Sequence, residues 1–215
     1  MQPAYQLIYD KLFEHYGPQS WWPAETPFEM MIGSILVQNT NWRNVDKALI
    51  KLGPYFEPEI IDHFPIEDLA QLIRSSGFYN IKAKRIKAFM EWFRQYDYDT
   101  KRIKAINNTE LRKALINIHG IGKETADVML VYAFEKPIFV VDAYARRIFY
   151  RLGYNMPTSY DGFRKLVEKE LPEELTLYNE FHALLVEHAK QFCRSKPICK
   201  ECPLLDICDQ RLELK

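Results

Sequence analysis

The chain has 215 residues, of which 47% are hydrophobic, 27% are charged, four are cysteines, and only 8 are glycines and 12 prolines. These numbers exclude disordered, collagen-like and disulfide-stapled chains, and they are typical of a globular protein with room for one domain or two small ones. The 29 basic and 29 acidic residues cancel, which excludes a uniformly basic surface but leaves open nucleic-acid binding through local patches.

The N-terminal region carries no recognisable targeting segment. The first thirty residues show no basic flank followed by an apolar run, and nowhere do eighteen uncharged apolar residues occur in succession. A signal peptide needs the first pattern and a membrane-spanning helix needs the second. We therefore expect neither secretion nor a membrane span, and we expect the protein to be cytoplasmic.

Helical periodicity dominates the remaining sequence. Apolar residues recur at positions i, i+3, i+4 and i+7, the pattern of an amphipathic helix, in at least six segments. In chain order these segments are residues 28–36, 66–73, 86–93, 111–118, 126–133 and 181–192. Only residues 137–141 read as extended, and this stretch is too short and isolated to build a sheet. The predicted fold class is all-α.

Several helix ends are marked in the sequence. Thr26, Pro27 and Glu29 combine a capping hydroxyl, a proline at the first helical position and a glutamate three residues after the cap. Gly77 and Gly153 are suitable C-terminal stops. No repeat or low-complexity linker occurs, so a second domain would have to be assembled without a flexible tether.

Two of the predicted helices are joined by a glycine-containing turn. The residues between them read Ile118-His119-Gly120-Ile121-Gly122-Lys123. Glycines two positions apart permit a tight hairpin that approaches another backbone closely. The second helix then begins with exposed N–H groups and the positive end of its dipole, which together favour binding of a DNA phosphate.

An aspartate follows about twenty residues later. Asp142 ends the apolar run Val140-Val141 and precedes a predicted helix over residues 143–152. An ordinary helix cap accounts for this position, since an aspartate accepts hydrogen bonds from the first turn. The same bonds would favour the ionised carboxylate, so the cap is also a candidate catalytic group.

All four cysteines lie within sixteen positions near the C-terminus, in the pattern Cys193-x5-Cys199-x2-Cys202-x5-Cys208. Thiolates repel one another and gather at one point when short loops bring them to a metal, so this clustering favours an iron–sulfur cluster or structural zinc. A pair of disulfides is disfavoured in a chain without a secretion signal. The spacing alone does not choose between the two metals.

Taken together, the glycine hairpin, Asp142 and the four cysteines resemble the endonuclease III superfamily of DNA glycosylases, in which these elements occur in the same order. The resemblance runs from about residue 21 to the C-terminus. It implies two helical lobes flanking a DNA cleft: a six-helix block with the helix-hairpin-helix over residues 24–135, and a second lobe from residues 1–23 and 136–215. The second lobe would carry a 4Fe–4S cluster in the loop 193–208, with zinc as the alternative.

Two departures from that family bear on chemistry. Bifunctional members read Gly-Val-Gly-Arg-Lys-Thr-Ala at the hairpin, and here Glu124 occupies the position of the Schiff-base lysine. A carboxylate cannot form an imine, and Lys123 projects about 100° away on the helix, so lyase activity by this route should be absent. The first cysteine interval is five residues where the family usually has six, which still allows four thiolates to meet.

Several short sequence motifs resemble those of the monofunctional 3-methyladenine glycosylase branch, among them Trp21-Trp22-Pro23, Gln38-Asn39-Thr40 and Ser76-Gly77-Phe78. The resemblance implies a role for each of the following sets of residues. The catalytic carboxylate is Asp142; the base pocket contains Trp21, Trp22, Pro23, Trp42, Glu124 and Lys190; the DNA wedge is Gln38 and Phe78; the phosphate contacts are Gly120, Gly122, Lys123, Arg194, Lys196 and Lys200; and the metal ligands are Cys193, Cys199, Cys202 and Cys208.

The implied function is excision of alkylated purines such as 3-methyladenine from double-stranded DNA by a monomeric glycosylase without lysine-dependent lyase activity. An N3- or N7-alkylated purine is cationic and already a good leaving group, so flipping the base, holding it on aromatic faces and stabilising the sugar are the remaining tasks. Three alternatives stay open at this point: a bifunctional endonuclease III-like enzyme for oxidised pyrimidines, a DNA-damage-binding protein without catalysis, and a metal-dependent regulator that uses the cysteine loop as a redox sensor.

Overall fold

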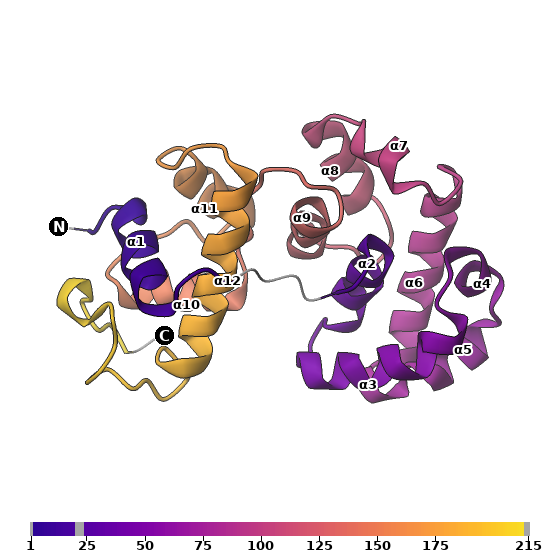
Figure 1. The fold of residues 1–215 in the computed structure, drawn as a ribbon, viewed down its shortest axis with the longest axis horizontal. Helices are drawn as coiled ribbons and strands as arrows, with labels where there is room; N and C mark the ends of the chain where they lie inside the picture. The colour runs from indigo at the N-terminus through magenta and orange to yellow at the C-terminus, as the bar shows by residue number, and fades with distance from the viewer. Residues whose placement is uncertain (1, 20–23, 213–215) are drawn as a thin grey trace. The chain divides into compact units, whose positions relative to one another are not determined.

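The computed structural model describes residues 2–19 and 24–212, and those residues form twelve α-helices and three short 3₁₀ helices without any β-strand. The all-α prediction is confirmed. The chain divides into two compact units, one made of residues 22–136 and the other of residues 1–21 and 137–215 (Figure 1). Within the described ranges, no helix has both the length and the apolar character that crossing a membrane requires.

The continuous unit, residues 22–136, contains α2 to α9 and two of the 3₁₀ helices. In chain order these are α2 (Pro27–Leu36), α3 (Trp42–Leu52), η1 (Gly53–Tyr55), α4 (Pro58–His63), α5 (Ile66–Leu72), η2 (Arg74–Ser76), α6 (Tyr79–Arg94), α7 (Thr100–Lys104), α8 (Asn108–Ile116) and α9 (Lys123–Tyr132). That is two α-helices more than the six expected here. The short helices α4 and α7 span less than two turns, which is too little for apolar periodicity to register.

Helix α2 forms the centre of this unit. From Phe28 to Leu36 all of its side chains except that of Glu29 are buried, and it packs against α3, α6 and α9. The predicted N-terminal signal is confirmed, since the Thr26 hydroxyl accepts a hydrogen bond from the Glu29 amide at 3.1 Å and Pro27 occupies the first turn. A helix buried all round is fixed at both ends by its neighbours, so the residues that follow it are held in place.

The discontinuous unit joins the N-terminal helix to the last third of the chain. It contains α1 (Tyr5–Tyr16), α10 (Ala143–Arg151), α11 (Tyr160–Glu168), α12 (Leu175–Gln191) and η3 (Leu205–Ile207). The long helix α12 packs against both α1 and α10 (Figure 1). Buried side chains from all four α-helices, including Leu12, Phe149, Phe163 and Phe181, share one hydrophobic core.

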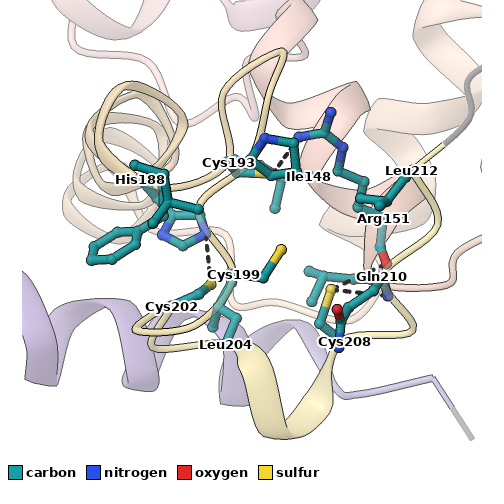
Figure 2. Close-up of a pocket in the computed structure, with 14 residues that line it drawn as sticks. Ile148, Arg151, His188, Cys193, Cys199, Cys202, Leu204, Cys208, Gln210 and Leu212 are labelled. Carbon is teal, nitrogen blue, oxygen red and sulfur yellow. Dashed lines mark hydrogen bonds between the residues drawn. The ribbon is translucent and has the colours of Figure 1, made fainter.

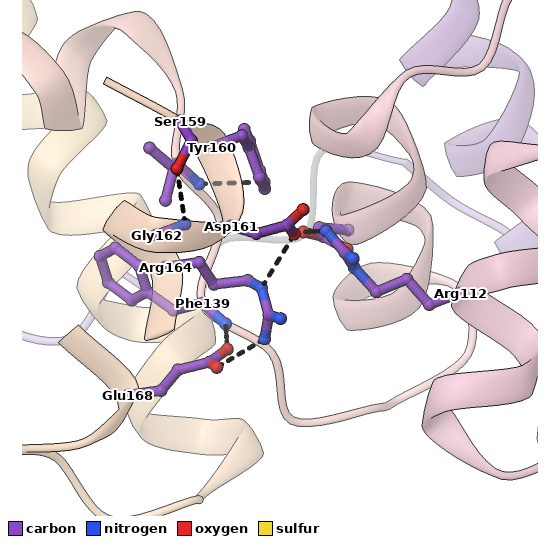
Figure 3. Close-up of polar contacts among 10 residues, drawn as sticks. Arg112, Phe139, Ser159, Tyr160, Asp161, Gly162, Arg164 and Glu168 are labelled. Carbon is purple, nitrogen blue, oxygen red and sulfur yellow. Dashed lines mark hydrogen bonds and ion pairs between the residues drawn. The ribbon is translucent and has the colours of Figure 1, made fainter. Parts of the chain in front are cut away.

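The extended stretch predicted at residues 137–141 is part of no sheet, and side chains of α11 satisfy its backbone instead. The Phe139 amide donates to a Glu168 carboxylate oxygen at 2.9 Å, and the Val141 amide donates to the Tyr160 hydroxyl at 3.2 Å. Figure 3 shows Glu168 between Phe139 and Arg164. The Arg164 guanidinium donates to the second carboxylate oxygen of Glu168 at 2.5 Å. The segment therefore leads at a fixed position into α10, which begins directly after Asp142.

The two predicted glycine stops both lie in the left-handed region that glycine favours. Gly153, with φ of 103°, follows the last turn of α10. Gly77, with φ of 67°, ends the 3₁₀ turn η2 rather than the helix over 66–73, because α5 itself ends at Leu72.

Candidate functional site

Asp142 is the N-cap of α10, as the sequence predicts. One carboxylate oxygen accepts a hydrogen bond from the Ala145 amide at 2.7 Å, and the side chain is only 13% exposed. The other oxygen lies 3.6 Å from Nε2 of His182, a buried side chain of α12. A carboxylate held in this way is a preorganised negative charge, which stabilises a positive charge that develops beside it.

His182 was not among the residues identified from the sequence. It is 5% exposed and lies about 100° around α12 from Phe181, outside the apolar face that the periodicity of residues 181, 184, 185 and 188 predicts. Buried polar side chains are ordinarily matched to a partner. No local sequence signal singled it out, because its approach to Asp142 is a tertiary contact.

The glycine hairpin joins α8 to α9 within the continuous unit. Gly120 has a φ of 85°, and a Cβ atom on it would collide with the side chain of Arg85. Glycine is therefore required there both by the backbone conformation and by the close packing. Gly122 has a φ of −84° and open space around it, so neither reason applies at that position.

The N-terminus of α9 has no side-chain cap. Its N-cap is Gly122, which has no side chain to bond the first turn, and both Lys123 and Glu124 are exposed at its start. Backbone N–H groups at such an end, together with the helix dipole, attract an anion. Phosphate binding at Gly120, Gly122 and Lys123 stays a prediction.

Gln38 lies directly against this hairpin. Its Nε2 donates to the Gly120 carbonyl at 3.1 Å and to the Thr125 hydroxyl at 3.0 Å, while its Oε1 accepts from the Arg85 guanidinium. The second expected wedge residue, Phe78, is 64% exposed and has a φ of 48° at the N-cap of α6. A large aromatic side chain that is exposed on a left-handed backbone position is uncommon and marks a place where function can outweigh local stability.

The expected base pocket is described only in part. Trp42 opens α3, is half-buried and packs on Gly33 of α2, where an added Cβ would lie 3.1 Å from the ring. Lys190 is exposed near the end of α12. Trp21, Trp22 and Pro23 lie outside the described residues. Trp42, Glu124, Gln38 and Phe78 thus belong to the continuous unit, and Asp142 and Lys190 to the discontinuous one.

The four cysteines line a single pocket with a cavity volume of about 30 Å³ in the discontinuous unit (Figure 2). All four are free thiols, Cys193 is buried, and the other three are half-buried. Burial raises the pKa of the Cys202 thiol to about 11 and also raises the pKa of Cys208. These thiols would ionise at neutral pH only with a positive charge among them, such as that of a metal.

The pocket has the donor set for a metal group but not the geometry of one closed ion site. Within residues 2–19 and 24–212, no three histidine, cysteine or carboxylate side chains converge on a point where one ion could be held. Hydrogen bonds already surround the thiols: the Arg151 guanidinium donates to Cys193 Sγ at 3.3 Å, and the Gln210 amide donates to Cys208 Sγ at 3.3 Å. Four soft donors around one shared space fit a multinuclear cluster.

Two arginines of α10 hold the start of the cysteine loop. Arg147 donates to the Cys193 carbonyl at 2.8 Å, and the buried Arg151 donates to the Arg194 carbonyl at 2.6 Å and the Ser195 carbonyl at 3.2 Å. The side chains of Arg194, Lys196 and Lys200 are exposed on this loop. Helix α10 therefore carries the candidate catalytic carboxylate at one end and supports the cationic loop from the other.

Comparison with known proteins adds the following findings. The family model described as HhH-GPD superfamily base excision DNA repair protein matches residues 32–173. A protein of Methanocaldococcus jannaschii, provisionally named a DNA repair glycosylase, is 44% identical over 94% of each chain. A crystal structure of 3-methyladenine DNA glycosylase from H. pylori bound to 1,N6-ethenoadenine is 30% identical, with a TM-score of 0.73 over 86% of this chain and 94% of that one. A non-covalent endonuclease III–DNA complex is 25% identical, with a TM-score of 0.82 over 95% and 94%.

Proposed function

Because the chain belongs to the HhH-GPD superfamily of base excision DNA repair proteins and is a DNA glycosylase of that superfamily, we propose that it hydrolytically removes alkylated purines such as 3-methyladenine. The observation that carries this proposal is the pairing of a capped, half-buried Asp142 with a glutamate at the lyase lysine's position. The similarity to a 3-methyladenine glycosylase that holds 1,N6-ethenoadenine supports the substrate class.

Asp142 supplies the charge that the reaction needs. A cationic alkylpurine leaves without prior protonation, so the transition state concentrates positive charge on the sugar. The carboxylate, fixed through the Ala145 amide at 2.7 Å, stabilises this charge and orients the attacking water. Removing one preorganised electrostatic group from an active site typically costs about 100-fold to 1,000-fold in rate.

Aromatic side chains hold the flipped base in this proposal. Trp42 is half-buried at the start of α3, and Trp21, Trp22, Pro23, Glu124 and Lys190 complete the proposed pocket. Stacking on an aromatic face is worth about 1–3 kcal/mol per base, and a cationic base gains roughly 0.5–2 kcal/mol more from the ring quadrupole. These contributions favour an alkylated purine over a neutral one.

Glu124 makes the enzyme monofunctional in this proposal. It lies in the exposed first turn of α9, where a lysine would form a Schiff base with the sugar in bifunctional relatives. A carboxylate is not a nucleophile toward that aldehyde. The substitution Glu124→Lys should therefore create a borohydride-trappable adduct with DNA that contains an abasic site. Denaturing electrophoresis detects such an adduct, and its absence would contradict the assigned position of Glu124.

The phosphate contacts come from both units. The hairpin glycines and Lys123 provide backbone amides and one cation at the start of α9, and Arg194, Lys196 and Lys200 provide three exposed cations on the cysteine loop. Phosphate contacts position the duplex without reading its sequence, so binding should weaken steeply with added salt.

The four cysteines hold a 4Fe–4S cluster in this proposal. Four cysteines that line one pocket are a soft donor set that fits such a cluster, whose irons are bound by cysteine thiolates. When bound, the group supplies covalent cross-links that tie the loop 193–208 together. The residues of α10 keep the loop in place through Arg147 and Arg151.

The experiment that tests the proposal is incubation with methylated duplex DNA, followed by chromatography of the freed bases. Gels of the same DNA, run with and without hot alkali, report strand breaks. Release of 3-methyladenine with breaks only after alkali is the expected result. Breaks without alkali would favour the bifunctional enzyme for oxidised pyrimidines, and release of no base at all would contradict the proposal.

A further inference from the structure

One lysine of α6 is buried and binds backbone instead of facing solvent. Lys82 is 1% exposed, and its Nζ donates to the Leu36 carbonyl at 2.7 Å and to the Ser76 carbonyl at 2.6 Å. Leu36 is the last residue of α2 and Ser76 the last of η2. A single ammonium group thus links the ends of two elements that are forty residues apart in sequence.

Both carbonyls stand two residues before a proposed wedge side chain. Leu36 precedes Gln38, and Ser76 precedes Phe78. Both turns also contain a non-glycine residue in the left-handed region, with φ of 55° at Asn39 and 48° at Phe78. Such conformations are strained and persist only where surrounding contacts impose them. The two hydrogen bonds from Lys82 are contacts of that kind.

The next turn of α6 extends the same arrangement. Arg85 donates to Oε1 of Gln38, and the stem of its side chain packs against Gly120. Gln38 in turn donates to the Gly120 carbonyl at 3.1 Å. Arg85 of α6 therefore holds the side chain of Gln38. Lys82 of the same helix holds the backbone two residues before Gln38 and two residues before Phe78.

An aliphatic side chain would fill the place of Lys82 without the cost of burying a charge. It would leave two carbonyls without their donor, and unpaired buried polar groups are strongly disfavoured. Because burial also keeps Lys82 away from any sugar, the side chain is not available as a substitute Schiff-base lysine. From its buried position, Lys82 instead fixes the turn after α2 and the turn after η2 relative to each other.

We propose that Lys82 is a positioning residue that sets the spacing between Gln38 and Phe78, so that both side chains enter the gap left by a flipped nucleotide together. The inference deepens the proposed function, because it rests on the wedge role assigned there to these two residues. It concerns insertion into the duplex and is independent of which base is removed.

The test uses a duplex with a tetrahydrofuran abasic analogue opposite 2-aminopurine, whose fluorescence rises when its stacking is disturbed. At DNA-saturating protein, the parent should give a clear rise, and Lys82→Met should reduce the fraction of inserted complex by about tenfold, since the two wedge side chains would no longer be held at the spacing that fills the gap. Native gels on the same samples confirm that all DNA is bound.

Lys87→Met is the matched control. Lys87 lies on the same helix, and its Nζ likewise donates to two carbonyls, those of Ile61 at 2.9 Å and Asp62 at 2.7 Å, at the end of α4. Its loss should lower stability in the same manner but leave the fluorescence rise intact. If Lys82→Met does not fold, Lys82→Gln is measured in its place.

The outcomes distinguish a failure of the positioning role of Lys82 from a failure of the proposed function. A Lys82 variant that gives the parent's rise, or a Lys87 variant that loses as much, would overturn the positioning role. A parent that gives no rise would overturn the wedge assignment and this inference with it. A parent that gives the rise but releases no alkylated base would refute the proposed substrate and leave the role of Lys82 standing.

Discussion

At the scale of single residues, Asp142 has an observed role as a helix cap and a proposed role in catalysis, and both require the same geometry. The hydrogen bond from the Ala145 amide caps α10 and also directs the carboxylate. The second oxygen faces His182, so the orientation of the carboxylate depends on two helices, α10 and α12. Its role as a helix cap is therefore compatible with the catalytic role proposed for Asp142.

The sequence indicated the first of these contacts but not the second. A cap is a local feature, because an aspartate and the amide three residues later are adjacent in the chain. The approach of His182 depends on the packing of α12 against α10, forty residues away. The same limit applies to Lys82, whose two acceptors lie on α2 and η2, and to Arg151 under the cysteine loop.

Lys82 also carries a prediction about pH. Burial lowers the pKa of Lys82 from 10.5 to about 8, so between these values the unfolded chain binds a proton that the folded chain has released. The free energy of unfolding should then rise with pH across this window, by up to about 3 kcal/mol, and the gain is lost as pH falls through 8. Lys82→Met should lack this rise.

The measurement is urea unfolding of parent and variant at several pH values between about 7.5 and about 10.5. The difference between the two should grow with pH. Lys113→Met, which changes an exposed lysine of α8, serves as the control and should follow the parent. A constant difference between parent and Lys82→Met across the window would contradict the shifted titration.

At the scale of elements, the helix-hairpin-helix depends on one of its two glycines for its shape. Gly120→Ala would place a Cβ against Arg85 on a backbone with φ of 85°. We predict a loss of about 2 kcal/mol in the free energy of unfolding, since both the left-handed conformation and the displaced Arg85 are costly. Because Arg85 also holds Gln38, affinity for duplex DNA should fall too.

Gly122→Ala is the matched comparison. This residue has a φ of −84°, and a Cβ would meet nothing within 4 Å. The change should lower stability by much less than Gly120→Ala, and thermal or urea unfolding of both variants measures the two costs. Equal losses would show that the turn is not held by the contact between Gly120 and Arg85.

The sequence predicted the elements with long apolar faces and missed those without them. Helices α2, α5, α6, α8, α9, α10 and α12 were all indicated, although α6 and α12 begin several residues earlier than their periodic segments. Helices α1, α3 and α11 were not identified, and neither were the short α4 and α7. Apolar spacing shows which face is buried, and it weakens where a helix is short or packs on loops.

At the scale of the whole molecule, the chain forms two units, and only the discontinuous one contains the cysteine pocket. Loss of the metal group should therefore act on one unit. Cys202→Ser should lose iron and visible absorbance, and amide hydrogen exchange should accelerate in the loop 193–208 and the helices around it. Helices α2 to α9 should keep their protection.

The control for this change is Leu205→Ser, at an exposed position between the last two cysteines. It should keep the iron and the protection pattern of the parent. Purified parent protein with zinc and no iron would contradict the proposed cluster. Loss of protection throughout α2 to α9 in Cys202→Ser would contradict the independence of the two units.

In the proposed function, Asp142 drives hydrolysis of the glycosidic bond of an alkylated purine. The most direct test is single-turnover release of 3-methyladenine from duplex DNA by the parent and by Asp142→Asn, with DNA affinity measured on the same samples. The asparagine still caps α10, so the fold and DNA binding should be kept while the rate falls by about 100-fold or more. Equal rates of release at equal affinity would contradict the account.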